Sequence, residues 1–202
     1  MPTRGFVGRR PAEEEAKRLP PGQYRTDDFP VLSLGPTPSV DVATWKFTIN
    51  NGPRPLARWN WVEFEALPRT SLRKDIHCVT KWSKFDTHWE GVSIDDLFAA
   101  AGITPPTPFL LAQSHDGYDT NLPVADVISG KAIIATRFNG EPLQAEHGGP
   151  ARLLVPHLYF WKSAKWVKGL RFTARDEAGF WELRGYHMYG DPWREQRYTN
   201  DP

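Results

Sequence analysis

Glycine and proline divide this sequence into short segments, and this limits the folds open to it. The chain has 202 residues, of which 16 are Gly and 19 are Pro, and both residues interrupt regular structure. The segments between them show no regular alternation of strand and helix. The expected strands are 45–50, 74–80, 109–112, 132–137, 152–155 and 167–173, and the expected helical segments are 61–67, 94–101 and 123–128. This pattern predicts an α+β fold, a mixed sheet with short helices.

The ends of these segments carry the clearest local signals. Asn60 precedes the first expected helix and Glu63 stands three residues later, a spacing typical of a capping box. Ser93 starts the second helix in the same way, and Gly102 ends it. The first strand alternates apolar and polar residues and runs into Asn51-Gly52, which predicts a tight turn.

Composition and charge exclude several classes of protein. Hydrophobic residues make up 40% of the chain and charged residues 24%, and the net charge is only +1, so we expect a globular protein that binds no nucleic acid. No apolar run is long enough to span a membrane. Residues 1–22 are polar and are expected to form a flexible arm, followed by a single domain over 23–202. Arg9-Arg10 is not followed by the apolar stretch of an export signal, so a cytoplasmic location is expected.

The chain has a single cysteine, Cys78, at the end of an expected strand. One cysteine cannot form an internal disulfide or a multi-thiolate metal cluster. It is either a small buried hydrophobe or a reactive thiol. His77 and Lys81 are close in sequence and would favour the thiolate, which is also a suitable ligand for a transition metal.

Two further segments carry residues that bind anions. His147 and Arg152 flank a Gly-Gly-Pro turn that enters an apolar strand. Segment 159–169 places three lysines among aromatic and small residues. These segments are either a tight connection and a solvated basic loop, or a phosphate site built from ammonium and backbone N–H groups.

In order, these motifs resemble those of the sulfite oxidase superfamily, the molybdopterin-binding oxidoreductases. Segment 78–83 (CVTKWS) followed by 89–92 (WEGV) resembles the family's molybdenum-cysteine segment. Segment 147–156 (HGGPARLLVP) is similar to its pterin-binding turn and strand, and 162–167 (KSAKWV) to its cofactor-phosphate loop. The resemblance covers roughly residues 24–172 and implies a sulfite oxidase-type molybdopterin-binding fold.

The resemblance also implies a cofactor, Mo-molybdopterin, with molybdenum carried by one pyranopterin dithiolene. Cys78 would be its only protein ligand. The residues implied in cofactor binding are Thr26, Asp27, Phe29, Ser114, His147, Arg152, Ser163, Ala164 and Lys165.

The activity expected from the resemblance is oxygen-atom transfer on a small sulfur- or nitrogen-oxide substrate. Lys81 would assist with charge or proton delivery as a catalytic residue beside Cys78. Since the sequence has no haem, flavin or iron–sulfur motif, electrons would pass to or from an external redox partner. Two alternatives stay open: a hydrolase or transferase with Cys78 as nucleophile, and a non-catalytic Trp-rich ligand-binding domain.

The residues after the cysteine depart from the pattern of the sulfite-oxidising members, and this departure bears on the substrate. Sulfite-oxidising members have Arg residues soon after the metal cysteine, whereas residues 79–82 here are VTKW. That stretch is more similar to the bacterial methionine-sulfoxide reductase catalytic subunits. The aromatic-rich segment 179–197 lies outside the matched motifs, and we expect it at the mouth of the active site, where it would influence substrate choice.

Overall fold

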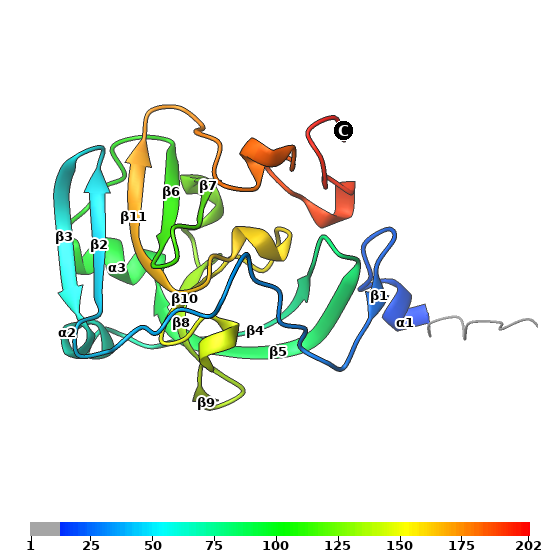
Figure 1. Ribbon diagram of the computed structural model, residues 1–202, viewed down its shortest axis with the longest axis horizontal. Helices are drawn as coiled ribbons and strands as arrows, with labels where there is room; N and C mark the ends of the chain where they lie inside the picture. Colours follow the sequence, from blue (N-terminus) through cyan, green and yellow to red (C-terminus); the bar gives the residue numbers. More distant parts are fainter. Residues whose placement is uncertain (1–12) are drawn as a thin grey trace, which may run out of the picture.

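Strands of two mixed sheets dominate the computed structural model, and the helices are few and short (Figure 1). One sheet has five strands in the order β3-β2-β11-β6-β7: β2 (Lys46–Asn51), β3 (Arg54–Asn60), β6 (Phe109–Ser114), β7 (Asp119–Pro123) and β11 (Val167–Thr173). The other has six strands: β1 (Tyr24–Arg25), β4 (Thr70–His77), β5 (Trp82–Ser93), β8 (Ile133–Phe138), β9 (Glu141–Pro142) and β10 (Arg152–Leu154). The β2–β11 and β1–β5 pairs are parallel and the others antiparallel. The predicted α+β class with mixed pairing is therefore confirmed, with two sheets instead of one.

The structure describes residues 13–202, so residues 1–12, with the Arg9-Arg10 pair and half of the expected arm, lie outside the described residues. The rest of the expected arm begins with helix α1 (Glu13–Ala16) and contacts the six-stranded sheet. Arg18 donates from Nη2 to Asp75 of β4 at 2.5 Å and to Asp86 of β5 at 2.9 Å. Residues 17–22 therefore run along the surface of this sheet.

The capping residues predicted the N-terminal ends of the two longer helices correctly. Asn60 and Glu63 form the expected reciprocal capping box at α2 (Trp61–Glu65), which ends two residues earlier than predicted. Helix α3 (Ile94–Ala101) has the predicted bounds, with Ser93 accepting a hydrogen bond from the Asp96 N–H and Gly102 in the left-handed region. In residues 13–202 no helix has the length and apolar character needed to cross a bilayer.

Five strands were not predicted: the two-residue strands β1 and β9, and strands β3, β5 and β7, whose residues do not form apolar runs. Strand β3 lies at a sheet edge and carries Arg54, Pro55 and Arg58, and an edge strand tolerates proline and charge. Strand β5 is the longest of the fold, yet charged residues and a positive-φ residue, Asp86, interrupt its pattern. The helical turn expected over 123–128 is present as one 3-10 turn, Val124–Asp126, which directly follows strand β7.

The strand predicted over 74–80 is wrong at its C-terminal end, because β4 ends at His77. Residues 78–81 form the turn between β4 and β5. The Cys78 N–H donates to the Trp82 carbonyl at 2.9 Å, and the Lys81 N–H donates to the Cys78 carbonyl at 3.0 Å. Lys81 takes a positive φ of 78°, so the chain reverses directly after the cysteine and presents it at the tip of a hairpin.

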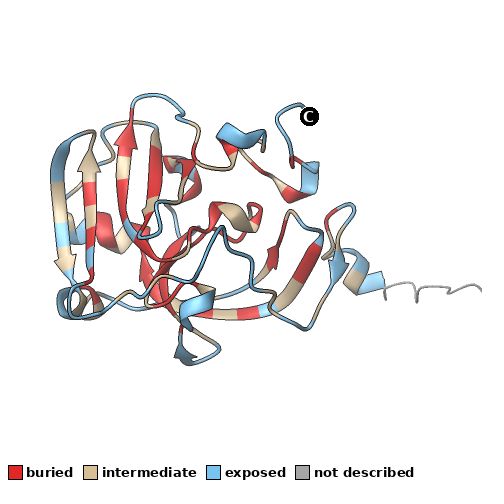
Figure 2. Cartoon of the chain, viewed as in Figure 1, coloured by how far each residue is buried: buried red, intermediate tan, exposed pale blue. Residues whose placement is uncertain are grey.

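Buried side chains form two clusters, and the cysteine belongs to the smaller one. The larger cluster joins α3 to β2, β6 and β11, and Figure 2 shows buried residues on each of these three strands. The smaller cluster packs Cys78, Trp82 and Trp89 against β8 and β10. Gly91 allows this close approach of β5 to β8, since a Cβ there would lie 2.0 Å from the Ile134 carbonyl oxygen. The Trp-x-Gly element after the cysteine therefore combines a buried ring with a position that only glycine fits.

Replacement of Gly91 by alanine tests this packing. We expect Gly91→Ala to lower the free energy of unfolding by about 3 kcal/mol, because the backbone of β8 must move to admit the methyl group. Urea denaturation monitored by circular dichroism measures the change. Gly35→Ala is the matched control, since nothing lies within 4 Å of its added Cβ, and its effect should stay within about 0.5 kcal/mol. Equal effects of the two substitutions would contradict the close contact between Gly91 of β5 and the backbone of β8.

Candidate active site

The molecule has a cavity of about 300 Å³ where the β4–β5 turn meets the loops after β10. It joins five parts of the chain: segment 29–34, the turn at Cys78, residues 116–118 between β6 and β7, residues 147–166 and the start of the C-terminal segment. Segment 26–45 has no helix and no strand, and it crosses the front of the molecule from β1 to β2 (Figure 1). The cavity lining is Phe29, Pro30, Leu32, Ser33, Leu34, Cys78, Val79, Thr80, Trp82, Asp116, Tyr118, His147, Arg152, Phe160, Trp161, Ser163, Ala164, Lys165, Trp166, Trp181 and Tyr186.

Cys78 supplies the cavity with a thiol held by hydrogen-bond donors. The side chain is buried, and Thr80 Oγ1 donates to Cys78 Sγ at 3.2 Å. Burial raises the pKa of the Cys78 thiol, while the Thr80 hydroxyl, the N–H groups of Thr80 and Val79 and the charge of Arg197 act in the opposite direction. These donors stabilise negative charge on sulfur, which suits a thiolate ligand to a soft metal.

Arg152 brings a buried positive charge to the cavity with no carboxylate partner. Its side chain donates from Nη1 to the His147 carbonyl at 2.8 Å and from Nη2 to the Ser163 carbonyl at 2.7 Å. Nε is buried and has no hydrogen-bond partner, and none of the ion pairs in residues 13–202 includes this guanidinium. Burial lowers the pKa of Arg152 to about 9. A buried cation of this kind is costly by itself and favours an anionic ligand.

Lys165 and His147 extend this basic region. Lys165 Nζ donates to Ser33 Oγ at 2.7 Å and to the Glu146 carbonyl at 2.8 Å. Burial and the nearby Arg152 charge lower the pKa of Lys165 to about 8. The His147 ring stacks on Phe29 with centroids 3.9 Å apart, and burial together with Arg152 lowers its pKa. An anion entering the cavity would therefore meet two cations and a neutral imidazole.

The Gly-Gly turn allows these groups to converge. Gly148 has φ of 107°, and a Cβ there would lie 3.0 Å from Lys165 Cβ and 3.1 Å from Arg152 Cβ. At Gly149 a Cβ would lie 2.0 Å from the Leu143 carbonyl oxygen. Both positions need glycine, Gly148 because the Lys165 and Arg152 side chains lie close and Gly149 because the Leu143 backbone does.

The cavity brings together most of the residues expected from the sequence. Those that line it are Phe29, Cys78, His147, Arg152, Ser163, Ala164 and Lys165. Four expected residues are not in the lining: Thr26, Asp27, Lys81 and Ser114.

Of these four residues, Thr26 and Asp27 make other contacts, Lys81 faces solvent and Ser114 is buried elsewhere. The Thr26 N–H donates to the Ser83 carbonyl, and Asp27 pairs with Arg25 at the surface. Lys81 is exposed. Ser114 is buried at the end of β6, and its Oγ has no partner. Their expected roles in cofactor binding and catalysis therefore stay predictions.

Sequence reasoning missed several aromatic residues and one carboxylate of the lining. Asp116 lies two residues after Ser114, in a turn where it accepts a hydrogen bond from the Tyr118 N–H at 3.0 Å. Trp161, Trp181 and Tyr186 bring three rings to the cavity. The aromatic-rich segment 179–197 contains Trp181 and Tyr186, and segment 159–169 contains Trp161, but such rings are equally compatible with core packing.

Comparison with known proteins decides the family. Residues 34–181 match the oxidoreductase molybdopterin binding domain. The chain belongs to this family. It is 40% identical over 197 residues to the uncharacterized oxidoreductase YuiH of Bacillus subtilis (strain 168), covering 97% of this chain and 100% of that relative. The resemblance stated from the sequence motifs is confirmed, and the chain is a molybdopterin oxidoreductase of sulfite oxidase type.

Other similar proteins share part of their length with this chain. The putative protein-methionine-sulfoxide reductase subunit YedZ1 of Azospira oryzae (strain ATCC BAA-33 / DSM 13638 / PS) is 24% identical over 75% of this chain and 57% of the relative. Sulfite oxidase of Arabidopsis thaliana is 32% identical over 50% of this chain and 23% of the relative. The sulfane dehydrogenase SoxCD from Paracoccus pantotrophus has the same fold, with a TM-score of 0.60 and 23% identity over 69% of this chain and 40% of that chain.

The residues of the cavity fit the family's molybdopterin cofactor. The unpaired Nε of Arg152 and the unpaired indole N–H of Trp82 are buried donors beside the cavity, and each can bind a polar atom of a ligand. Arg152 and Lys165 carry the charge that a phosphate needs, and Cys78 offers the soft sulfur that molybdenum needs.

Binding of a simple anion to the cofactor-free protein tests this basic region. We expect sulfate to stabilise the fold by about 1.4 kcal/mol when its concentration is about tenfold above Kd. Because Lys165 and Arg152 lose charge as pH rises through about 8 and about 9, the stabilisation should decline between about pH 7 and about pH 9.5. Thermal unfolding with and without sulfate measures it.

The matched variants for this test replace Lys165, which precedes β11, and Lys168, which lies in β11. Lys165→Gln should remove most of the sulfate effect, whereas Lys168→Gln should keep it, since Lys168 is exposed and does not line the cavity. A stabilisation that is independent of pH and equal in both variants would place sulfate elsewhere on the protein.

Proposed function

We propose that this protein catalyses oxygen-atom transfer on a small sulfur- or nitrogen-oxide substrate, with a molybdenum cofactor in the cavity and electrons exchanged with an external redox partner. The observation that carries the proposal is the presence, in one cavity, of the Cys78 thiol and the buried, uncompensated Arg152 guanidinium. When bound, the cofactor supplies two-electron redox chemistry coupled to oxygen transfer.

Each part of the cavity has a role in this proposal. Cys78 is the protein ligand to the metal, and its hairpin turn fixes the direction of the sulfur. Arg152 and Lys165 bind the phosphate of the cofactor, and Lys165 exchanges its present contacts with Ser33 and Glu146 for that phosphate. Ser163 and Ala164 line the cavity, where the Ser163 carbonyl accepts from Arg152, and the His147 ring, which stacks on Phe29, would contact the cofactor. Thr26, Asp27, Ser114 and Lys81 are proposed to act from outside the cavity lining.

The names of similar proteins support the substrate class. They include sulfite oxidases, a nitrate reductase and a putative protein-methionine-sulfoxide reductase subunit. All of these names refer to a sulfur or nitrogen oxide, and reduction of such an oxide consumes two electrons and two protons and releases water. Since Cys78 is the only cysteine of this chain, a separate protein or small carrier exchanges these electrons.

The contacts of His77 weigh against a cysteine nucleophile. A Cys-dependent hydrolase needs a base within hydrogen-bond reach of the thiol. The neighbouring His77 ring instead bonds through Nδ1 to Ser83 Oγ at 2.8 Å, and burial lowers its pKa to about 4. The oxidoreductase proposal therefore accounts for Cys78 better than the hydrolase or transferase alternative.

Metal analysis of Cys78→Ala tests the proposal. Protein made in a host that supplies the cofactor should contain about one molybdenum and one pterin per chain. We expect the substitution to lower the molybdenum content and to reduce oxide turnover more than about 100-fold, because the metal loses its protein ligand. Inductively coupled plasma mass spectrometry and pterin fluorescence measure the content.

Ser71→Ala is the control for this variant, because Ser71 is exposed on β4, the strand that leads to the cysteine. It should retain both metal and turnover. Molybdenum-free wild-type protein whose hydrolytic activity is lost on alkylation of Cys78 would instead establish the nucleophile alternative.

A further inference from the structure

Two peptide groups of the β4–β5 turn donate hydrogen bonds to Cys78 Sγ. Burial raises the pKa of the Cys78 thiol, and the N–H groups of Thr80 and Val79 hydrogen-bond to the sulfur and act against burial. The Val79 N–H shares a planar peptide group with the Cys78 carbonyl, and the Thr80 N–H shares one with the Val79 carbonyl. In a trans peptide the carbonyl and the N–H point in opposite directions. A partner that holds either carbonyl therefore also fixes the direction of an N–H group toward the sulfur.

Each of these carbonyls accepts a hydrogen bond from a side chain that is distant in the sequence. Gln23 Nε2 donates to the Cys78 carbonyl at 3.0 Å, and Arg197 Nη1 donates to the Val79 carbonyl at 2.5 Å. Both residues lie outside the matched residues 34–181, one before them and one after them. We call Gln23 and Arg197 the carbonyl clamp. The clamp holds the cysteine turn from the two segments that flank the matched domain.

Strand β1 holds Gln23 in place. The Tyr24 N–H donates to the Lys81 carbonyl at 2.8 Å, where the parallel pairing of β1 with β5 begins. The Gln23 side chain is half-buried, and its Oε1 accepts from Ser83 Oγ at 3.4 Å. Since the amide oxygen has this partner, the amide nitrogen is the atom that faces the Cys78 carbonyl. The amide group therefore has one orientation, with its donor toward the turn.

Arg197 brings a buried charge to the same turn. The residue is 7% exposed, and its Nη2 donates to the Pro21 carbonyl at 3.4 Å. Its guanidinium lies 5.0 Å from the centre of the Tyr159 ring. The ion pair that it makes with Glu195 is long, at 3.8 Å, and the Glu195 side chain is 49% exposed. Most of the Arg197 charge is therefore left to act on the cysteine turn.

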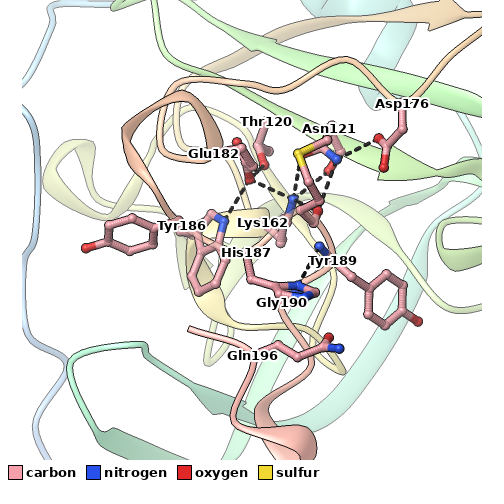
Figure 3. Close-up of polar contacts among 12 residues, drawn as sticks. Thr120, Asn121, Lys162, Asp176, Glu182, Tyr186, His187, Tyr189, Gly190 and Gln196 are labelled. Carbon is pink, nitrogen blue, oxygen red and sulfur yellow. Dashed lines mark hydrogen bonds and ion pairs between the residues drawn. The ribbon is translucent and has the colours of Figure 1, made fainter. Parts of the chain in front are cut away.

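A buried ion pair anchors the C-terminal segment that carries Arg197. Lys162 Nζ and Glu182 Oε1 are 2.6 Å apart, and their side chains are 1% and 0% exposed. Figure 3 shows the Lys162 ammonium group enclosed between Glu182 and Asn121, with His187 on the same segment as Glu182. The His187 N–H donates to the Arg197 carbonyl at 3.1 Å. The position of Arg197 is therefore fixed by the core of the fold.

We propose that Gln23 and Arg197 are positioning residues, which fix the two N–H donors to Cys78 Sγ and thereby raise the reduction potential of a metal bound to this sulfur. The inference rests on the proposed function and concerns the tuning of its metal centre. A hydrogen bond to a thiolate withdraws electron density from the sulfur, and a nearby positive charge favours an added electron. A donor at a peptide carbonyl also polarises the N–H of that peptide, so the clamp strengthens both hydrogen bonds to the sulfur.

Redox titration of the molybdenum-loaded protein tests the proposal. Electron paramagnetic resonance follows the appearance of Mo(V) as the metal accepts one electron from a series of mediator dyes. We expect Gln23→Leu and Arg197→Met each to lower the equilibrium constant of this reduction about 10-fold, a shift of about 59 mV to lower potential. Molybdenum content should stay that of wild type, because Cys78 still binds the metal. An unchanged potential in either variant, with intact metal, would overturn the proposal.

Conservative substitutions separate tuning from folding. Arg197→Lys keeps the charge and a donor, so it should restore most of the wild-type potential. Arg197→Gln keeps a donor without the charge and should give a potential between those of wild type and Arg197→Met. Arg194→Met is the control, since Arg194 is exposed on the same segment, and it should keep the wild-type potential. Equal shifts in Arg197→Lys and Arg197→Met would assign the effect to lost packing and would contradict the role of the guanidinium.

Hydrogen exchange of the cofactor-free protein tests the clamp without a metal. Mass spectrometry measures deuterium uptake by the peptide that contains residues 78–83. We expect about 10-fold faster exchange in Gln23→Leu and in Arg197→Met, with wild-type exchange in Arg194→Met and unchanged exchange of the core strand β11 in all variants. If wild-type protein binds no molybdenum, the proposed function fails, and this exchange still decides whether the clamp holds the turn. Equal exchange of the turn in wild type and in both clamp variants would overturn the proposal.

Discussion

The buried guanidinium of Arg152 is the constraint on which the rest of the site depends. Two backbone carbonyls bind it, the Phe160 ring lies 4.1 Å from its centre, and its Nε has no partner. Backbone carbonyls and a ring satisfy hydrogen bonds but do not neutralise a charge, so the fold carries an electrostatic cost here. A bound phosphate removes that cost. The affinity of the site for its cofactor therefore originates in strand β10 and in the Gly-Gly turn that brings Lys165 beside it.

The six-stranded sheet brings this charge into the same cavity as the Cys78 sulfur. Strand β5 follows the Cys78 turn and pairs with β8, and β8 pairs with β10, which begins at Arg152. The family match ends at residue 181, yet Glu182, Tyr186 and Arg197 lie beyond it and contact or line the cavity region. The matched domain thus supplies Cys78, Arg152 and Lys165 to the cavity, and residues beyond it complete the surroundings of the cavity.

The sequence was most informative where structure depends on local contacts. The capping box at α2, both ends of α3 and the whole of β11 were predicted because each follows from residues within a few positions. Strand β5 was missed because its charged residues have no apolar period, and only its pairing with β4 and β8 makes it a strand. The turn at Cys78 was assigned to a strand for a related reason, since the positive φ of Lys81 has no signature in its residue type.

The site could be predicted where the family motifs are contiguous, as at His147, Arg152 and Lys165. It could not be predicted where the contact arises from distant segments. Trp161 and Glu182 are separated along the chain and meet only in the fold, and an aromatic residue has the same sequence signature in a core as in a binding site. The roles of Thr26 and Asp27 stay predictions, because their segment lines the cavity only from Phe29 onward.

A crystal structure of the molybdenum-loaded protein would test the central claim most directly. The account predicts that the metal is bonded to Cys78 Sγ and that the cofactor phosphate lies within hydrogen-bond distance of Arg152 and Lys165 Nζ, with Arg152 Nε paired to the cofactor. A metal bonded to another residue, or a phosphate bound elsewhere while the Arg152 guanidinium stays without a negative partner, would contradict it.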